Sequence, residues 1–88
     1  MRNKLKTHRN RIEALSYDIV ALLERRAYMV EKVGEIKEEL RMPINDPARE
    51  QELLDRLISS TTLPPELIEA VFNTIFAHSR VLQVNQAS

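Results

Sequence analysis

The sequence predicts an all-α protein of three helices, one very long, one short and one of medium length. The 88 residues contain one glycine and four prolines, so few turns interrupt the chain. Apolar residues recur at helical spacing in three segments, and proline-containing breaks separate these segments. A chain of this length has room for one domain, which we assign to residues 1–88.

The first predicted helix runs from about residue 3 to residue 41. Its apolar residues form two series with heptad spacing, as in the seam of a coiled coil. These are Leu5, Ile12, Ile19, Val33 and Leu40 in one series, and Leu15, Leu22, Met29 and Ile36 in the other. The helix must end before Pro43, because proline lacks an amide hydrogen and clashes with the preceding turn.

The second predicted helix spans about residues 47–59. Asp46 is suited to cap its N-terminus, and Pro47 to its first position, where a missing donor costs little. The buried stripe of this helix comprises Leu53, Leu54, Leu57 and Ile58.

The third predicted helix follows a loop rich in serine and threonine and spans about residues 65–84. Pro65 and Glu66 open it. Its apolar face comprises Ile68, Val71, Phe72, Ile75, Phe76 and Leu82.

The length of the first helix predicts a homodimer. A helix over residues 3–41 is about 57 Å long, whereas a compact chain of this size has a radius of gyration of about 12 Å. Two shorter helices cannot cover its whole apolar seam, but the long helix of a second chain can, in an antiparallel pair with a dyad near residues 20–21. The alternative is a monomer whose first helix is bent or broken at Gly34.

Polar side chains occupy positions where the helix patterns require apolar ones. Arg26 lies within the heptad seam, Ser79 and Gln83 continue the apolar stripe of the third helix, and Glu50 begins that of the second. Arg49 lies in a first helical turn, where the helix dipole disfavours a cation. An unpaired buried guanidinium is strongly destabilising, so Arg26 requires an anionic partner. The alternatives are a purely structural pair of Arg26 with Glu50, simple exposure of Ser79 and Gln83, and a surface position for Arg49 and Glu50 in an ordinary N-terminal turn.

Two further cations, Arg9 and Lys37, border the seam. The alternative is that each simply lies in solvent on the flank of a coiled coil. Arg26 and Lys37 are separated by about 16 Å along the axis, close enough to hold one small ligand. Arg9 lies about 26 Å from Arg26 in the same chain. Antiparallel pairing, however, places the partner's Arg9 between them. We therefore expect two cationic pockets per dimer, each suited to a small dicarboxylate.

Composition excludes several other classes of function. The 13 Lys and Arg residues balance 13 Asp and Glu residues, and there is no cysteine. No global charge attracts nucleic acid or a membrane, and thiolate chemistry is excluded. The sequence contains no apolar run of about 18 residues, the length that a transmembrane helix needs. No apolar stretch of the kind found in signal peptides follows the basic N-terminus. We expect a cytoplasmic protein that needs no metal or cofactor and binds neither nucleic acid nor membrane.

Five motifs follow one another in chain order at helix-compatible spacing. They are Arg9-x-x-Ile12, Leu22-Leu23-x-x-Arg26, Val33-Gly34-x-x-Lys37, Asp46-Pro47-x-Arg49-Glu50 and Ser79-x-x-x-Gln83. Together they resemble the all-helical chorismate mutase family. The resemblance implies an intertwined homodimer with shared active sites. It also implies an isomerase that converts chorismate to prephenate in phenylalanine and tyrosine biosynthesis.

The resemblance also assigns the site residues. They are Arg9 of the partner subunit, Arg26, Lys37, Asp46, Arg49, Glu50, Ser79 and Gln83. By position, the arginines hold the two carboxylates of the substrate, and Ser79 contacts a carboxylate. Lys37 and Gln83 face the ether oxygen of the breaking bond and, with Arg26, are the catalytic residues. Glu50 and the backbone of Asp46 position the ring hydroxyl.

Two other functions stay open at this point. An isochorismate pyruvate-lyase uses the same fold and a similar set of cations. A non-catalytic helical module for dimerisation or regulation is the other alternative, although it does not explain Arg26 within the seam.

Overall fold

Three helices account for most of the chain in the computed structural model: α1 (Arg2–Leu40), α2 (Pro47–Ser59) and α3 (Pro65–Ala87). The structure describes the backbone of residues 2–87 and the side chains of residues 2–84. Within these residues there is no strand, which confirms the all-α prediction. α1 begins and ends one residue earlier than expected, and α3 continues to Ala87 instead of ending near Val84.

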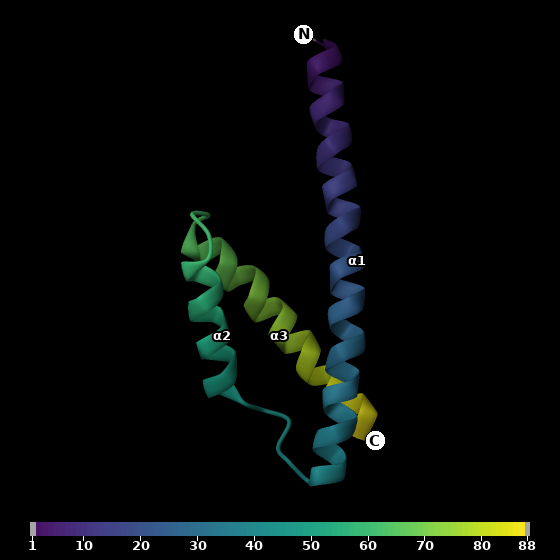
Figure 1. Cartoon of the computed structure of the whole chain (residues 1–88), viewed down its shortest axis with the longest axis vertical. Coiled ribbons are helices and arrows are strands. Elements are labelled where there is room, and N and C mark those ends of the chain that lie inside the picture. Colours follow the sequence, from purple (N-terminus) through teal and green to yellow (C-terminus); the bar gives the residue numbers. More distant parts are fainter. Residues whose placement is uncertain (1, 88) are drawn as a thin grey trace.

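α3 connects the molecule, because it packs against both α1 and α2 (Figure 1). α2 and α3 run antiparallel to each other beside the C-terminal half of α1, and the N-terminal half of α1 extends beyond them. The chain is therefore elongated, with principal extents of 59 × 25 × 15 Å and a radius of gyration of 16.8 Å. α1 is continuous through Gly34, so the broken helix considered as an alternative does not occur.

α1 ends at a backbone turn rather than by fraying. The amide of Met42 donates to the carbonyl of Lys37 at 2.8 Å, and the amide of Arg41 donates to that of Glu38 at 3.1 Å. Arg41 has a φ of 55°, in the left-handed region that closes helices in this type of motif and that glycine adopts most easily. Pro43 follows, so the helix cannot resume.

α2 begins with the predicted cap. The side chain of Asp46 accepts a hydrogen bond from the amide of Arg49 at 3.1 Å, and Pro47 occupies the start of the helix. Both residues fix the first turn, where free amide hydrogens otherwise lack partners. The cap therefore sets the orientation of Arg49 and Glu50, which lie in the same turn.

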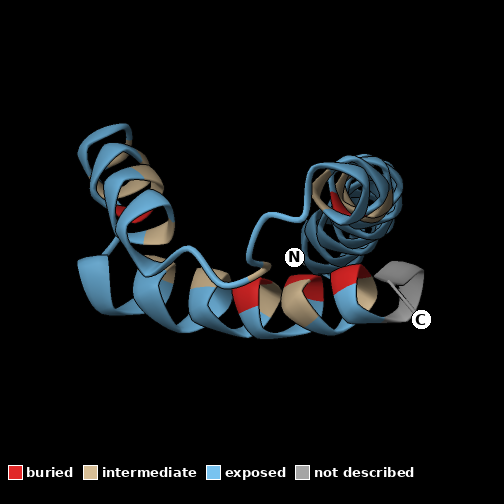
Figure 2. Ribbon diagram, turned by 90° about the horizontal axis from the view of Figure 1, so that it is seen from below, coloured by how far each residue is buried: buried red, intermediate tan, exposed pale blue. Residues whose placement is uncertain are grey.

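The core of the single chain is small and lies along α3 (Figure 2). Leu54 and Phe76 are its buried apolar side chains, at 6% and 4% exposure, and the Phe72 ring centroid lies 6.0 Å from that of Phe76. Ser79 and Gln83 are equally buried, at 8% each. The interpretation of these two polar residues as simply exposed is therefore wrong. Val71, expected on the buried face, is exposed instead.

The apolar seam of α1 is uncovered in the single chain, with exposed fractions from 43% to 63%. It comprises Leu5, Ile12, Leu15, Ile19, Leu22, Met29, Val33, Ile36 and Leu40. A contiguous apolar surface of this extent is typical of a protein–protein interface. Across the described residues, none of the helices is both long enough and apolar enough to cross a membrane.

The left-handed conformation of Arg41 generates a stability prediction. Replacing Arg41 by glycine should raise the free energy of unfolding by about 0.5–1 kcal/mol, because glycine adopts a positive φ without steric cost. Urea unfolding of the variant measures this gain. Arg41→Ala is the matched control, since it removes the same side chain but keeps the steric cost. An equal gain in both variants would contradict the explanation.

Candidate active site

One cavity of about 330 Å³ gathers seven of the eight predicted site residues. All three helices and the loop between α1 and α2 contribute to it. Its lining comprises Arg26, Val30, Val33 and Lys37 from α1, Ile44 and Asp46 from the loop, Arg49, Glu50 and Leu53 from α2, and Phe76, Ser79 and Gln83 from α3. In the view of Figure 2, α1 and α2 lie on the same side of α3. The cavity is thus bounded by residues that are far apart in the sequence.

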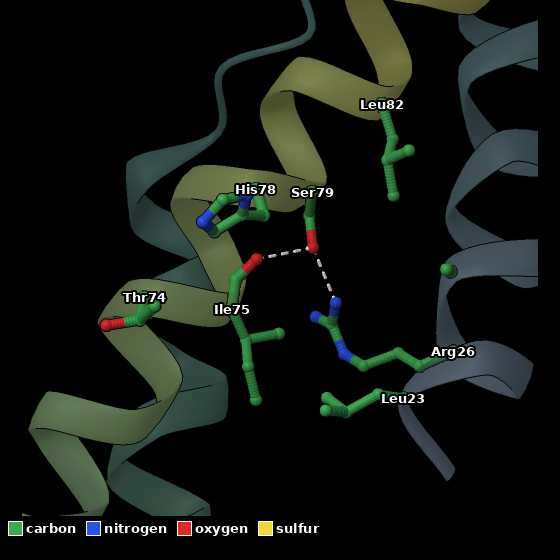
Figure 3. Close-up of a pocket in the computed structure, with 8 residues that line it drawn as sticks. Leu23, Arg26, Thr74, Ile75, His78, Ser79 and Leu82 are labelled. Atoms are coloured by element: carbon green, nitrogen blue, oxygen red, sulfur yellow. Dashed lines mark hydrogen bonds between the residues drawn. The ribbon is translucent and has the colours of Figure 1, made fainter. Parts of the chain in front are cut away.

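Arg26 crosses from α1 to α3 and is held there by Ser79 (Figure 3). Its Nη1 donates to the Ser79 hydroxyl oxygen at 2.6 Å, and that hydroxyl donates to the carbonyl of Ile75 at 2.8 Å. The guanidinium carbon also lies 5.8 Å from the centre of the Phe76 ring, a cation–π distance. Ser79 therefore orients Arg26, whereas the sequence predicted only a contact with a substrate carboxylate.

The electrostatic environment of Arg26 follows from its partial burial. Desolvation lowers the pKa of Arg26 from its usual value, and the negative charge of Glu50 acts in the opposite direction. The guanidinium remains charged at neutral pH, because an arginine side chain has a pKa far above 7. The site therefore contains a fixed positive charge that is only partly solvated.

Lys37 and Arg49 add two further cations to the lining of the cavity. The Lys37 ammonium donates to the carbonyl of Ile44 at 3.1 Å, which ties the end of α1 to the loop before α2. An ammonium has three donors, so this bond leaves others for a ligand. Arg49 projects from the first turn of α2, which the Asp46 cap fixes.

Glu50 is bound by a residue that sequence reasoning missed. Arg80 Nη1 donates to both carboxylate oxygens of Glu50 at 2.7 Å each, so this ion pair joins α2 to α3. The structural pair of Arg26 with Glu50, considered from the sequence, is thus replaced by another pair. The only signal for Arg80 was its place beside Ser79, next to the polar stripe of the third helix.

The cations of the cavity have no anionic partner among the described residues. The ion pairs found there join Lys32 to Glu35, Arg56 to Glu52 and Arg80 to Glu50, and none involves a cation of the cavity lining. Of the two carboxylates that line the cavity, Asp46 caps α2 and Glu50 binds Arg80. Arg26 and Lys37 are half-buried, whereas Arg49 is exposed. The arrangement is suited to binding an anion, because the two half-buried charges interact with it more strongly than exposed ones.

Gln83 reaches the cavity because Gly34 lets two helices approach closely. A Cβ atom added at Gly34 would lie 3.0 Å from the Gln83 Cα and 3.3 Å from its Cβ and Cγ. The Gln83 Oε1 is buried and lacks a hydrogen-bond partner among the described residues. Burying an amide oxygen without a hydrogen-bond partner lowers the stability of the fold. The position of this side chain is therefore maintained by its close packing against Gly34 and not by a hydrogen bond to Oε1.

Arg9 is the one predicted site residue that lies outside the cavity. It is exposed on the N-terminal half of α1, 17 residues before Arg26. This separation corresponds to about 26 Å along a continuous helix. Arg9 can therefore reach such a cavity only from a second chain.

The described side chains offer no group of three or more His, Asp or Glu residues that could hold a metal ion. His8 and His78 are both exposed. The lining of the cavity supplies guanidinium, ammonium, amide, hydroxyl and carboxylate groups.

Comparison with known proteins identifies the family. The chain matches the family described as chorismate mutase type II over residues 8–84, which covers the cavity and all three helices. The chain belongs to the chorismate mutase type II family. Membership of this family assigns it to the isomerases and confirms the resemblance noted from the five motifs.

Two curated relatives carry chorismate mutase in their names. A chorismate mutase of Methanocaldococcus jannaschii is 31% identical over 86 residues, which cover 94% of this chain and 87% of that protein. A bifunctional chorismate mutase/prephenate dehydratase of Aquifex aeolicus is 34% identical over 55 residues, which cover 62% of this chain and 15% of that protein. No solved structure matches the chain significantly.

The close approach at Gly34 predicts a sensitive position in this chorismate mutase fold. Gly34→Ala should lower kcat/KM by about threefold to tenfold, because the added methyl group lies 3.0 Å from the Gln83 Cα and pushes that backbone away slightly, whereas a full 1 Å misplacement costs about 100-fold. Steady-state kinetics measures the loss. Glu35→Ala, at the neighbouring exposed position, is the control and should retain activity.

In an unconstrained helix, alanine is more favourable than glycine by about 1 kcal/mol. A Gly34→Ala chain that is more stable than the wild type and fully active would therefore contradict the packing argument.

Proposed function

We propose that this chain catalyses the intramolecular rearrangement of chorismate to prephenate, on the route to phenylalanine and tyrosine. One observation carries the proposal: a cavity in which Arg26, Lys37 and Arg49 lack carboxylate partners among the described residues. Chorismate carries two carboxylates, which complement such a set of cations. The family of the chain and the name of its relative in M. jannaschii support this substrate.

The first task of the proposed site is to hold the substrate in its reactive conformation. Arg26, Arg49 and the partner's Arg9 bind the two carboxylates, because guanidinium–carboxylate pairs are bidentate and directional. Ser79 keeps the Arg26 guanidinium oriented before substrate arrives. Fixing both ends of the dianion folds the enolpyruvyl side chain over the ring, which lowers the entropic cost of the reaction.

The second task is to stabilise the charge that develops on the ether oxygen as its bond to the ring carbon lengthens. Lys37 and the amide N–H of Gln83 donate to this oxygen and so stabilise its developing charge. Glutamine donates this bond without first being protonated. Glu50 and the backbone of Asp46 orient the ring hydroxyl. No atom is transferred between molecules, so the mechanism requires no cofactor.

The proposed enzyme is a homodimer with two shared sites. The exposed seam of α1 supplies the interface, and it continues into an apolar groove of about 290 Å³ between α1 and α3. Leu23, Ala27, Ile75 and Leu82 contribute to this groove (Figure 3), and Arg26 and Ser79 line both the groove and the site cavity. An antiparallel partner helix that covers the seam also brings the partner's Arg9 towards the cavity.

A direct assay tests the activity. Purified chain should convert chorismate to prephenate, and Lys37→Ala should lower kcat by about 100- to 1,000-fold, as for loss of an oxyanion donor. Lys32→Ala is the control, because Lys32 lies on the same helix in an exposed ion pair with Glu35. Full turnover by the Lys37 variant contradicts the electrostatic role. Salicylate formed from isochorismate, without prephenate formed from chorismate, would instead identify a pyruvate-lyase.

A mixing experiment tests the shared sites. Arg9→Ala and Arg26→Ala homodimers should both be nearly inactive, because each of their sites lacks one arginine. A heterodimer of the two chains has one intact site, since both changes fall in the other. Random mixing should therefore recover about a quarter of wild-type activity.

Native mass spectrometry establishes that heterodimers have formed. Heterodimers without recovered activity would show that Arg9 does not serve the partner's site.

A further inference from the structure

Arg80 is an arginine next to the site for which the proposed function has no role. It follows Ser79 on α3, yet it lies outside the lining of the cavity. Its one strong interaction is the pair of 2.7 Å hydrogen bonds from Nη1 to the carboxylate oxygens of Glu50. The side chains of Arg80 and Glu50 are only 38% and 26% exposed. This ion pair is therefore the least exposed of those found among the described residues.

We propose that Arg80 is a positioning residue that keeps the carboxylate of Glu50 from pairing with the cations that bind substrate. The inference rests on the proposed function, because it concerns the same cavity and the same dianion. It adds a residue that acts through Glu50 and contacts no substrate atom.

The charges of the cavity show why such a residue is needed. Glu50 lines the same cavity as Arg26 and Arg49. Its negative charge already acts on Arg26, where it opposes the fall in pKa that burial causes. A glutamate side chain has three rotatable bonds, so without a fixed partner its carboxylate would turn towards the nearest guanidinium. In a partly desolvated site, such a pair is stronger than one in water.

An internal pair of this kind would compete with substrate. A dianion could bind Arg26 or Arg49 only after displacing Glu50 from it, so the apparent affinity would fall. Arg80 prevents this, because it binds both oxygens of Glu50 from outside the cavity. Each oxygen retains a second lone pair, so Glu50 can still accept a hydrogen bond from the ring hydroxyl.

A simple structural link between α2 and α3 is the competing explanation. Both explanations predict some loss of stability when Arg80 is removed. They differ when Glu50 is neutralised as well. If the pair is only a link, Glu50→Gln breaks the same link, so the KM of the double variant stays as high as that of Arg80→Met. If Glu50 competes with substrate, neutralising it removes the competitor, and the KM of the double variant falls below that of Arg80→Met.

Steady-state kinetics with chorismate distinguishes the two, using Arg80→Met, Glu50→Gln and the double variant. Arg80→Met should raise KM about tenfold, the cost of displacing a partly buried ion pair, and change kcat less than threefold. The KM of the double variant should return to within about twofold of that of Glu50→Gln alone, the coupling that a double-mutant cycle detects. A KM of Arg80→Met equal to that of the wild type, or a double variant whose KM is as high as that of Arg80→Met, overturns the proposal.

Two further variants make the experiment specific. Arg56→Met removes an arginine of α2 that pairs with Glu52 at 3.9 Å, with both side chains more than 60% exposed, and should leave KM unchanged. Arg80→Lys keeps a positive charge beside Glu50 and should lie between the wild type and Arg80→Met in KM. If Arg80→Met does not fold, Arg80→Lys with and without Glu50→Gln gives the same comparison.

The wild-type assay separates the inference from the function on which it rests. A wild-type chain that forms no prephenate contradicts the proposed function and this inference together. An active wild type whose KM does not respond to Arg80 contradicts the inference alone.

Discussion

The structure depends on keeping cations together without neutralising them from within the chain. Arg26, Lys37 and Arg49 line one partly buried cavity, and no carboxylate of the described residues forms an ion pair with them. Such an arrangement is unfavourable by itself, because like charges repel one another and the half-buried Arg26 has also lost part of its hydration. The fold holds it through Ser79, which orients Arg26, and through the helix cap that fixes Arg49. In the proposed mechanism, binding of the dianion relieves this repulsion.

The length of α1 explains why so much apolar surface remains uncovered in one chain. α1 is continuous over Arg2–Leu40, but α2 and α3 lie beside its C-terminal half only. The proposed homodimer accounts for both the remaining seam and Arg9, which is too far from the cavity to join it within one chain. In this proposal, one partner chain both covers the exposed seam of α1 and completes the site with its Arg9.

Much of this could be predicted from the sequence because it depends on spacing within one helix. Heptad spacing and prolines predicted the three helices, and polar residues on apolar stripes pointed to Arg26, Ser79 and Gln83. What escaped prediction depends on how helices dock. Arg80 meets Glu50 across two helices and 30 residues of sequence, and periodicity cannot reveal such a pair.

The contact of Gly34 with Gln83 is also set by docking. Sequence reasoning treated this glycine as a possible break in α1, and the structure shows it as the point of closest approach to α3. The most direct test of the central claim is a calorimetric titration of the chain with a bicyclic dicarboxylate that mimics the transition state of the rearrangement. The account predicts one molecule bound per chain, with an affinity that falls as salt concentration rises. Absence of binding at low salt, or binding that salt does not weaken, would contradict it.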